Sequence, residues 1–220
     1  MQEKTDYIKK LSFFDKLDEK DLELLLSISK ITKHPKNSVL YYEDDINDKL
    51  FFLVSGLLKV YKIDKYENEI FLYHIYSNSL ISELTSLDSK SIYCLSNAEF
   101  VEDSIVLEID FFDFRDYFLA KNILNSEFIN EILNKMMQLH CVVNRELVFD
   151  ATAKVAFMLA DDLEMFNTLK RHEVSFMLHI QPETLSRVLN KLKRSGVIDI
   201  QNNHINILDR EKLFNIYRGN

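Results

Sequence analysis

The chain has 220 residues, of which 47% are hydrophobic and 12% aromatic, so it can bury the cores of two domains. Three glycines leave little material for phosphate-cradling loops, and the P-loop, the dinucleotide fingerprint, G-x-S-x-G and H-E-x-x-H are all absent, so we expect no enzyme. The net charge of −8 is uneven: residues 151–220 carry ten lysines and arginines against eight aspartates and glutamates, which is +2 and leaves −10 to residues 1–150.

The N-terminal residues 5–30 have a helical pattern. Leu22, Leu25 and Leu26 form its apolar side, and an acidic run beside them is typical of a solvated face. The polar, acidic start is unlike a signal peptide, and no apolar stretch approaches the length that spans a bilayer. We therefore expect a cytoplasmic protein.

Four runs rich in β-branched and aromatic residues follow, separated by polar turns. These predicted strands are residues 38–42, 50–54, 57–62 and 70–76. Short strands at this spacing favour a roll or barrel. Gly56, between the second and third run, is expected at a turn that needs a positive φ.

Residues 126–150 form one long helical pattern without glycine or proline. Apolar residues recur in it at alternating intervals of three and four, as in a coiled-coil seam. The members of this seam are Ile129, Ile132, Met136, Leu139 and Val143. The seam predicts a dimer interface, and packing within the chain is the alternative.

Residues 171–195 carry the pattern of two short helices joined by a turn. Val174, Met177 and Leu178 form the apolar face of the first helix, and Pro182 suits the first position of the second. The second helix has two faces, an apolar one at Leu185, Val188, Leu189 and Leu192 and a polar one at Glu183, Ser186, Arg187 and Asn190. Such a helix can be anchored on one side and can hydrogen-bond base edges with the other. The alternative is an ordinary hairpin of two packed helices, which would bind no nucleic acid.

Charge and the residues that follow favour the nucleic-acid interpretation. Residues 170–194 hold six lysines and arginines against two glutamates, and a basic patch supplies the phosphate contacts of DNA binding. Gly196 then ends the helix, and residues 197–200 and 204–208 alternate as the strands of a hairpin with an asparagine tip. This order predicts a winged helix-turn-helix.

At residues 182–192 the sequence P-E-T-L-S-R-V-L-N-K-L resembles the recognition helix of the Crp/Fnr transcription regulators. The resemblance implies that Glu183, Ser186 and Arg187 read a TTGAT-like half-site, by the pairing of arginine with guanine and of glutamate with cytosine. A small residue is usual in that family at the turn where this chain has His179, and histidine tolerates a positive φ better than most residues. The other residues expected to contact DNA are Arg171, Thr184, Asn190 and Lys191.

The front of the chain resembles the same family, since residues 50–62 look like its cyclic-nucleotide-binding β-roll. In relatives that bind cyclic nucleotide, G-E-L followed by R-S or R-T holds the phosphate and ribose. The corresponding residues, which form the predicted effector pocket, are Ser82, Glu83, Leu84, Lys90 and Ser91. Because glycine and arginine are both replaced, the sequence does not favour cyclic AMP as the effector.

Metal-based sensing is limited by the ligands that the chain contains. Cys94 and Cys141 are its two cysteines, and an iron–sulfur cluster needs about four. Buried, inert thiols are the favoured interpretation, and a thiol redox switch is the alternative. None of the six histidines forms a ligand motif. A haem that senses nitric oxide or oxygen is the alternative, and the sequence identifies no cofactor.

Together these patterns predict an α+β protein of three segments. Residues 1–125 would form a β-roll of the jelly-roll type with flanking helices, residues 126–150 a dimerisation helix, and residues 151–220 the winged helix-turn-helix. The resemblance implies a homodimeric, signal-dependent transcription regulator that binds a palindromic operator in double-stranded DNA and contacts RNA polymerase, away from membranes. The alternative is a cyclic-nucleotide or other small-molecule binding protein whose helical C-terminus contacts a protein partner.

Overall fold

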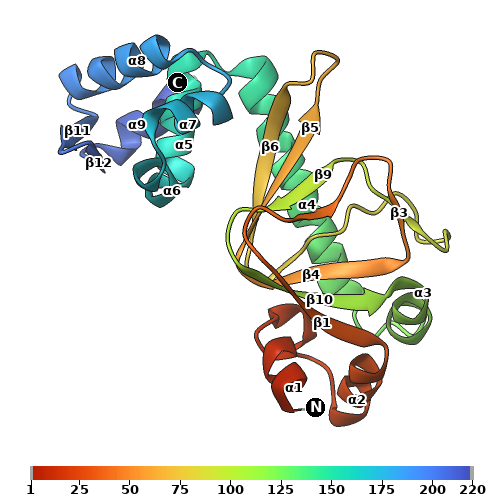
Figure 1. Ribbon diagram of the computed structural model, residues 1–220. Helices are drawn as coiled ribbons and strands as arrows, with labels where there is room; N and C mark the ends of the chain where they lie inside the picture. The colour runs from red at the N-terminus through yellow and green to blue at the C-terminus, as the bar shows by residue number, and fades with distance from the viewer. Residues whose placement is uncertain (1, 219–220) are drawn as a thin grey trace. The chain divides into compact units, whose positions relative to one another are not determined.

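The computed structural model describes residues 2–218, which form two compact units (Figure 1). The first extends to Gln138 and the second begins at Leu139. The boundary therefore falls inside a long helix. No helix among residues 2–218 is long and apolar enough to cross a membrane.

The N-terminal segment contains separate short helices and not the single helix expected over residues 5–30. Helix α1 spans Gln2–Ile8, the 3₁₀ turn η1 spans Ser12–Phe14, and α2 spans Glu19–Ser27. Asp18 caps α2 by accepting the Asp21 backbone N–H at 2.8 Å, which fixes a new helix start within the predicted helix. The residues after α2 form a strand because they pair with a distant strand, a tertiary contact that local periodicity does not reveal.

Two four-stranded antiparallel sheets form the β-roll of the first unit. One has the order β1 (Ser29–His34), β10 (Ser104–Asp110), β4 (Lys49–Ser55) and β7 (Ser79–Leu80). The other has the order β2 (Val39–Tyr41), β9 (Asn97–Phe100), β5 (Leu57–Ile63) and β6 (Glu69–Tyr76). A further pair joins β3 (Ile46–Asn47) to β8 (Ile92–Tyr93). The predicted roll and its four strands are confirmed, whereas β1, β3, β7, β8, β9 and β10 had not been predicted.

Gly56 lies between β4 and β5 with φ of 110°, as its position in the sequence predicts. A Cβ atom there would lie 2.0 Å from Oγ and 2.6 Å from Cβ of Ser104. The turn therefore needs glycine both for its backbone angle and for space.

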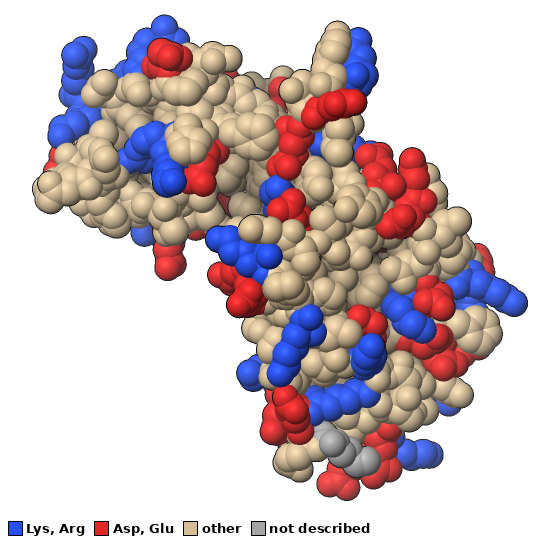
Figure 2. Space-filling view, viewed as in Figure 1, with Lys and Arg blue, Asp and Glu red and all other residues tan. Residues whose placement is uncertain are grey.

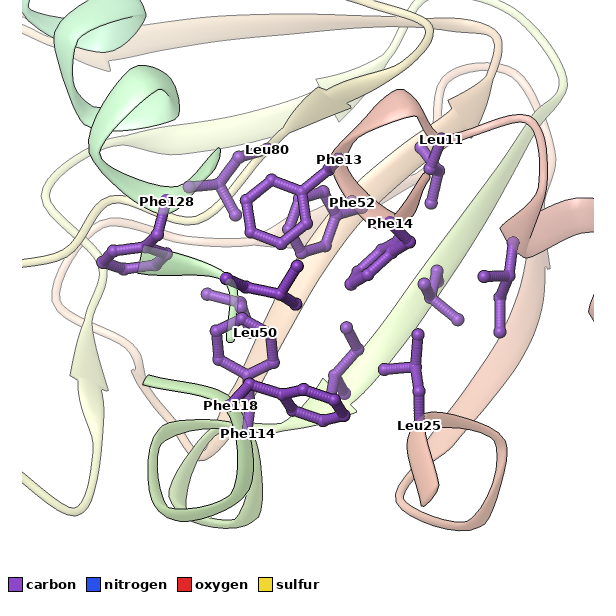
Figure 3. Packing of buried hydrophobic residues seen from close by; sticks show 14 of the residues in the cluster. Leu11, Phe13, Phe14, Leu25, Leu50, Phe52, Leu80, Phe114, Phe118 and Phe128 are labelled. Carbon is purple, nitrogen blue, oxygen red and sulfur yellow. The ribbon is translucent and has the colours of Figure 1, made fainter. Parts of the chain in front are cut away.

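The core of the first unit is aromatic and joins the N-terminal helices to the roll and to later helices (Figure 3). Phe13 and Phe14 of η1 pack against Phe52 of β4, with ring centroids 4.8 and 5.2 Å apart. Phe114 lies 6.1 Å from Phe128 in the same core. Burial of each such ring stabilises the fold by about 1.5–3 kcal/mol relative to exposure, so the first unit depends strongly on this cluster.

Helices connect the roll to the second unit. Helix α3 (Phe111–Phe114) continues into the π-helical turn η2 (Arg115–Leu119), and α4 (Asn125–Val143) ends in the π-helical turn η3 (Asn144–Val148). The helix expected over residues 126–150 is thus α-helical only to Val143. Phe149 is extended, and Asp150 caps the next helix by accepting the Ala153 N–H at 2.8 Å, so the chain changes direction there.

The second unit is a winged helix-turn-helix, as predicted. Its helices are α5 (Ala151–Asp161), α6 (Leu163–Thr168), α7 (Arg171–Met177), α8 (Pro182–Arg194) and α9 (Arg210–Arg218). The hairpin strands are β11 (Ile198–Gln201) and β12 (His204–Ile207). Its own core joins α5 to α8 and the hairpin, which holds the polar face of α8 in a fixed orientation within this unit.

Candidate nucleic-acid interface

The turn between α7 and α8 lies where the sequence places it, but it begins one residue earlier, at Leu178, which the sequence assigns to the first helix. Helix α7 ends at Met177, and the N–H groups of Leu178, His179 and Ile180 donate to carbonyls of α7 at 3.0–3.1 Å. His179 takes φ of 51°, the left-handed angle that reverses the chain. Pro182 then begins α8 at the position that the sequence predicts.

Helix α8 separates its two sequence patterns onto opposite sides. Its predicted apolar stripe is buried, with exposed fractions of 1% for Leu185, 5% for Val188 and Leu189, and 2% for Leu192. The polar side chains of Glu183, Ser186, Arg187, Asn190 and Lys191 are exposed, and Thr184 is half-buried. The anchored side fixes α8, and the free side presents two charge types, a hydroxyl and an amide.

Positive charge collects along the second half of α8 (Figure 2). A shallow hollow of about 690 Å³ is lined by Arg187, Asn190, Lys191, Arg194 and Ser195. A neighbouring hollow of about 590 Å³ adds Lys212 from α9 and Thr152 from the first turn of α5. Cations on two sides of one surface are suited to the phosphates of a nucleic-acid strand.

The wing is a two-residue hairpin. Asn202 and Asn203 take φ of 50° and 65°, the angles of a type I′ turn, which asparagine tolerates. The Arg171 guanidinium donates to the Asn203 carbonyl at 2.6 Å and stacks over Phe166 at 5.0 Å. Lys193 pairs with Asp199 at 3.2 Å. Arg171 is thus engaged with the wing tip, although the sequence places it among the DNA-contacting residues.

The predicted effector residues differ in burial and in their hydrogen-bond partners. Ser82 is buried and accepts the Phe51 N–H at 2.9 Å, and the Glu83 carboxylate accepts from Tyr73 Oη at 3.1 Å and Ser96 Oγ at 2.7 Å. Leu84 packs against the core of the unit. Lys90 is exposed, and the N–H of Ser91 donates to Ser89 Oγ at 3.1 Å.

Helix α4 adds two charged residues beside Glu83 that the sequence did not single out. The Lys135 ammonium donates to the carbonyl of buried Ile81 at 3.0 Å, and Glu131 accepts the Leu80 N–H at 3.3 Å. Burial lowers the pKa of Lys135 to about 8, against the opposing attraction of Glu83 and Glu131. The sequence gives no reason to single out Lys135 and Glu131, because charged residues between the apolar positions of a helical seam are usually solvated.

Neither cysteine has the environment of a reactive thiol. Burial raises the pKa of Cys94 to about 11 and raises the pKa of Cys141, so both thiols stay protonated at neutral pH. Within residues 2–218 there is no group of three or more histidine, cysteine, aspartate or glutamate side chains placed to hold a metal ion.

The predicted seam of α4 is exposed along its length. The exposed fractions are 57% for Ile129, 38% for Ile132, 56% for Met136, 50% for Leu139 and 47% for Val143. Leu133, Met137 and Leu147 widen this face beyond the predicted seam, with exposed fractions of 46%, 56% and 80%. An apolar face of this extent is unusual for a surface that stays in water.

Comparison with known proteins finds a family match for two parts of the chain. Residues 31–121 match the cyclic nucleotide-binding domain family, and residues 155–216 match the Crp-like helix-turn-helix domain family. The chain is 26% identical over 213 residues to the anaerobic regulatory protein of Pasteurella multocida, covering 91% of this chain and 77% of that protein. It is 23% identical over 189 residues to the protein of the same name from Bacillus subtilis, covering 81% and 79%.

Solved structures share the fold. A mutant of CooA from Carboxydothermus hydrogenoformans has a TM-score of 0.73 at 17% identity and covers 94% of this chain and 95% of its own. FixK2 from Bradyrhizobium japonicum has a TM-score of 0.70 at 15% identity and covers 86% and 97%. The order of β-roll, long helix and winged helix-turn-helix is therefore common to proteins of very different sequence.

Proposed function

Because the chain belongs to the Crp/Fnr family of DNA-binding transcription regulators, we propose that it acts as a dimer that reads a near-palindromic operator in response to a signal. Members of this family regulate transcription and are not enzymes. The single observation that carries the proposal is the division of α8 into a buried apolar stripe and an exposed polar face.

Three exposed residues at the start of α8 would read the bases. Arg187 can bind O6 and N7 of guanine with two hydrogen bonds, Glu183 can accept from N4 of cytosine, and Ser186 can contact a neighbouring base. All three are exposed, and the buried stripe behind them fixes the helix that carries them. The half-site proposed is TTGAT-like.

Other residues would hold the phosphate backbone. Lys191 borders both hollows, and Asn190 and Arg194 line the first, so they are placed beside the base-reading residues. Thr184 is half-buried beside them, and Arg171 would act mainly by holding the wing tip at Asn203. Phosphate contacts give affinity without sequence preference, so their number sets the salt dependence.

The apolar face of α4 supports a homodimer. A second copy of the same helix is its natural partner, because a seam of alternating three- and four-residue spacing is self-complementary in a parallel pair. A two-fold dimer would place two copies of α8 in successive major grooves, about 34 Å apart. The operator would then be an inverted repeat.

The signal would act on the first unit, around Ser82, Glu83 and Leu84 with Lys90 and Ser91. A cyclic nucleotide would have to displace the hydrogen bonds that Tyr73 and Ser96 already make to Glu83, which supports an effector other than cyclic AMP. The two relatives named anaerobic regulatory proteins support a signal linked to oxygen, nitric oxide or redox state, with haem as one carrier. RNA polymerase is the proposed partner of the DNA-bound dimer.

A titration tests the DNA-reading proposal. The purified chain is added to a labelled duplex with two inverted TTGAT half-sites, and to a scrambled duplex of equal length, at several salt concentrations. We expect tighter binding of the first duplex, and Arg187→Ala should raise its Kd by about 10- to 100-fold, as the loss of one bidentate base contact predicts. Lys191→Gln, the matched phosphate control, should weaken both duplexes alike and flatten the salt dependence.

Equal affinity for both duplexes would contradict the proposed base reading. No binding of any duplex at low salt, with or without candidate effectors, would instead favour a small-molecule binding protein whose C-terminal helices contact a protein.

A further inference from the structure

A partly buried polar cluster joins the turn before α8 to the segment that follows α4. The Glu146 carboxylate accepts a hydrogen bond from Nδ1 of His179 at 2.9 Å. The same carboxylate pairs with Nε of Arg145 at 2.7 Å and with Nζ of Lys154 at 3.4 Å. Lys154 also donates to the Leu178 carbonyl at 3.2 Å, so the cluster holds two neighbouring residues of the turn.

The cluster keeps Glu146 ionised. Burial alone would raise its pKa, but the hydrogen bonds from His179 and Arg145 outweigh burial and lower the pKa below its ordinary value. A hydrogen bond to an ionised carboxylate is stronger than one between neutral groups. The contact between His179 and Glu146 is therefore a strong link between two segments that are 33 residues apart.

Apart from its contact with Glu146, His179 has two costs at its position. Its φ of 51° is unfavourable for a residue with a Cβ atom, and glycine would take that angle without strain. Its Nε2 atom is buried and has no hydrogen-bond partner among the described residues. The turn alone would be better served by glycine, so the contribution of the histidine lies in its contact with Glu146.

The link joins the turn just before the DNA-reading helix α8 to the π-helical turn η3. His179 is three residues before Pro182, where α8 begins, and Glu183, Ser186 and Arg187 occupy the first two turns of that helix. Glu146 lies in the middle of η3, and π-helical turns of this kind often occur at functional sites. Hydrogen bonds to base edges are directional, so a small movement of the start of α8 weakens them.

We propose that His179 is a positioning residue for DNA reading, because its hydrogen bond to Glu146 holds the start of α8 in a fixed orientation relative to η3. The link selects the orientation in which the base-reading residues meet their bases. It adds little to phosphate binding, which tolerates small movements. This inference rests on the proposed reading of DNA by α8 and goes beyond it by assigning a residue that touches no base.

Two substitutions at the same position separate the link from the turn. In His179→Gly the favoured turn residue is present and the link is lost. In His179→Asn the side chain tolerates the same φ, and its amide nitrogen lies near the place of Nδ1, so the link is kept and the unpartnered Nε2 is removed. Thermal unfolding of each full-length variant shows whether both are folded.

The readout is the ratio of the Kd for the scrambled duplex to the Kd for the inverted TTGAT duplex at one salt concentration. We expect His179→Gly to lower this ratio roughly three- to tenfold through weaker binding of the specific duplex, as the loss of one charge-assisted hydrogen bond implies. His179→Asn should stay within about twofold of the wild type by the same reasoning. In a Glu146→Ala background, His179→Gly should change the ratio much less, because its partner is already gone.

An unchanged ratio in His179→Gly would overturn the proposal, and so would an equal loss in His179→Asn and His179→Gly when both are folded. If Glu146→Ala does not fold, the comparison of His179→Gly with His179→Asn still tests the proposal. A wild-type protein that does not distinguish the two duplexes would instead refute the proposed DNA reading itself, so the two failures are distinguishable.

Discussion

At the scale of single residues, the charges between α4 and the roll are the least expected feature of the first unit. Lys135 reaches the carbonyl of buried Ile81, and Glu83 is held by Tyr73 and Ser96. Tyr41 is also buried there, and burial with the nearby Glu83 raises its pKa. An ammonium group in these surroundings is stable only with nearby carboxylates, so its protonation state should affect the stability of the unit.

The lowered pKa of Lys135 predicts a specific pH dependence. Burial sets its folded-state pKa at about 8, below the ordinary value of 10.5, so between these values the unfolded chain binds more protons than the folded one. Stability should therefore rise with pH in that range, and the free energy of unfolding, measured relative to Lys135→Met, should increase by about 1 kcal/mol from pH 7.5 to 9.

Urea unfolding followed by tyrosine fluorescence measures this difference for the first unit, since Tyr217 is the only tyrosine after residue 138. Lys135→Met is the reference because other titrating groups, such as Cys94, are the same in both proteins. A difference that is constant or decreases with pH would show that the ammonium of Lys135 is not buried in the folded protein.

At the scale of elements, α4 and its exposed apolar face decide the proposed assembly. Met136→Glu places a charge in the centre of that face, and burying it in a dimer without a partner would be unfavourable by several kcal/mol. We expect the dimer dissociation constant to rise by at least about a hundredfold, on the same basis. Light scattering would then report the 26.0 kDa monomer.

Asn134→Glu is the matched control, since Asn134 is exposed on the same helix and lies away from the seam. It should leave the dimer intact. A wild-type protein that is monomeric at micromolar concentration, or a Met136→Glu variant that stays dimeric, would contradict the proposed interface.

The sequence predicted best those elements whose own periodicity carries the signal. Local sequence patterns predict the two faces of α8, the hairpin with its asparagine tip and the four central strands. The division of residues 5–30 into α1, η1, α2 and the start of β1 was not predictable, because the pairing of β1 with β10 joins segments about 75 residues apart. The contacts of Glu146, in the π-helical turn that ends α4, were likewise not predictable from local pattern.

For the candidate site, the sequence revealed the residues that face solvent but not the residues that support them. The exposed set on α8 follows from helical spacing. The engagement of Arg171 with the wing tip and the link from His179 to Glu146 depend on the tertiary fold. Charged residues identified by spacing alone therefore include some whose role is to hold neighbouring segments.

At the scale of the whole molecule, the chain joins an acidic β-roll unit to a more basic reader through one helix. Each unit has its own aromatic or aliphatic core, as separate domains do. The proposed signal-dependent regulation would require this separation, because a signal on one unit would have to alter DNA binding by the other without unfolding either.

Selection of bound duplexes from a pool with a randomised central segment tests whether paired copies of α8 read the operator. We expect enrichment of two inverted TTGAT-like half-sites with centres about 10 base pairs apart, and loss of preference at one G·C pair of each half-site when Arg187→Ala is used. No enriched sequence, or an enriched single half-site without two-fold symmetry, would contradict a paired reader built on α8.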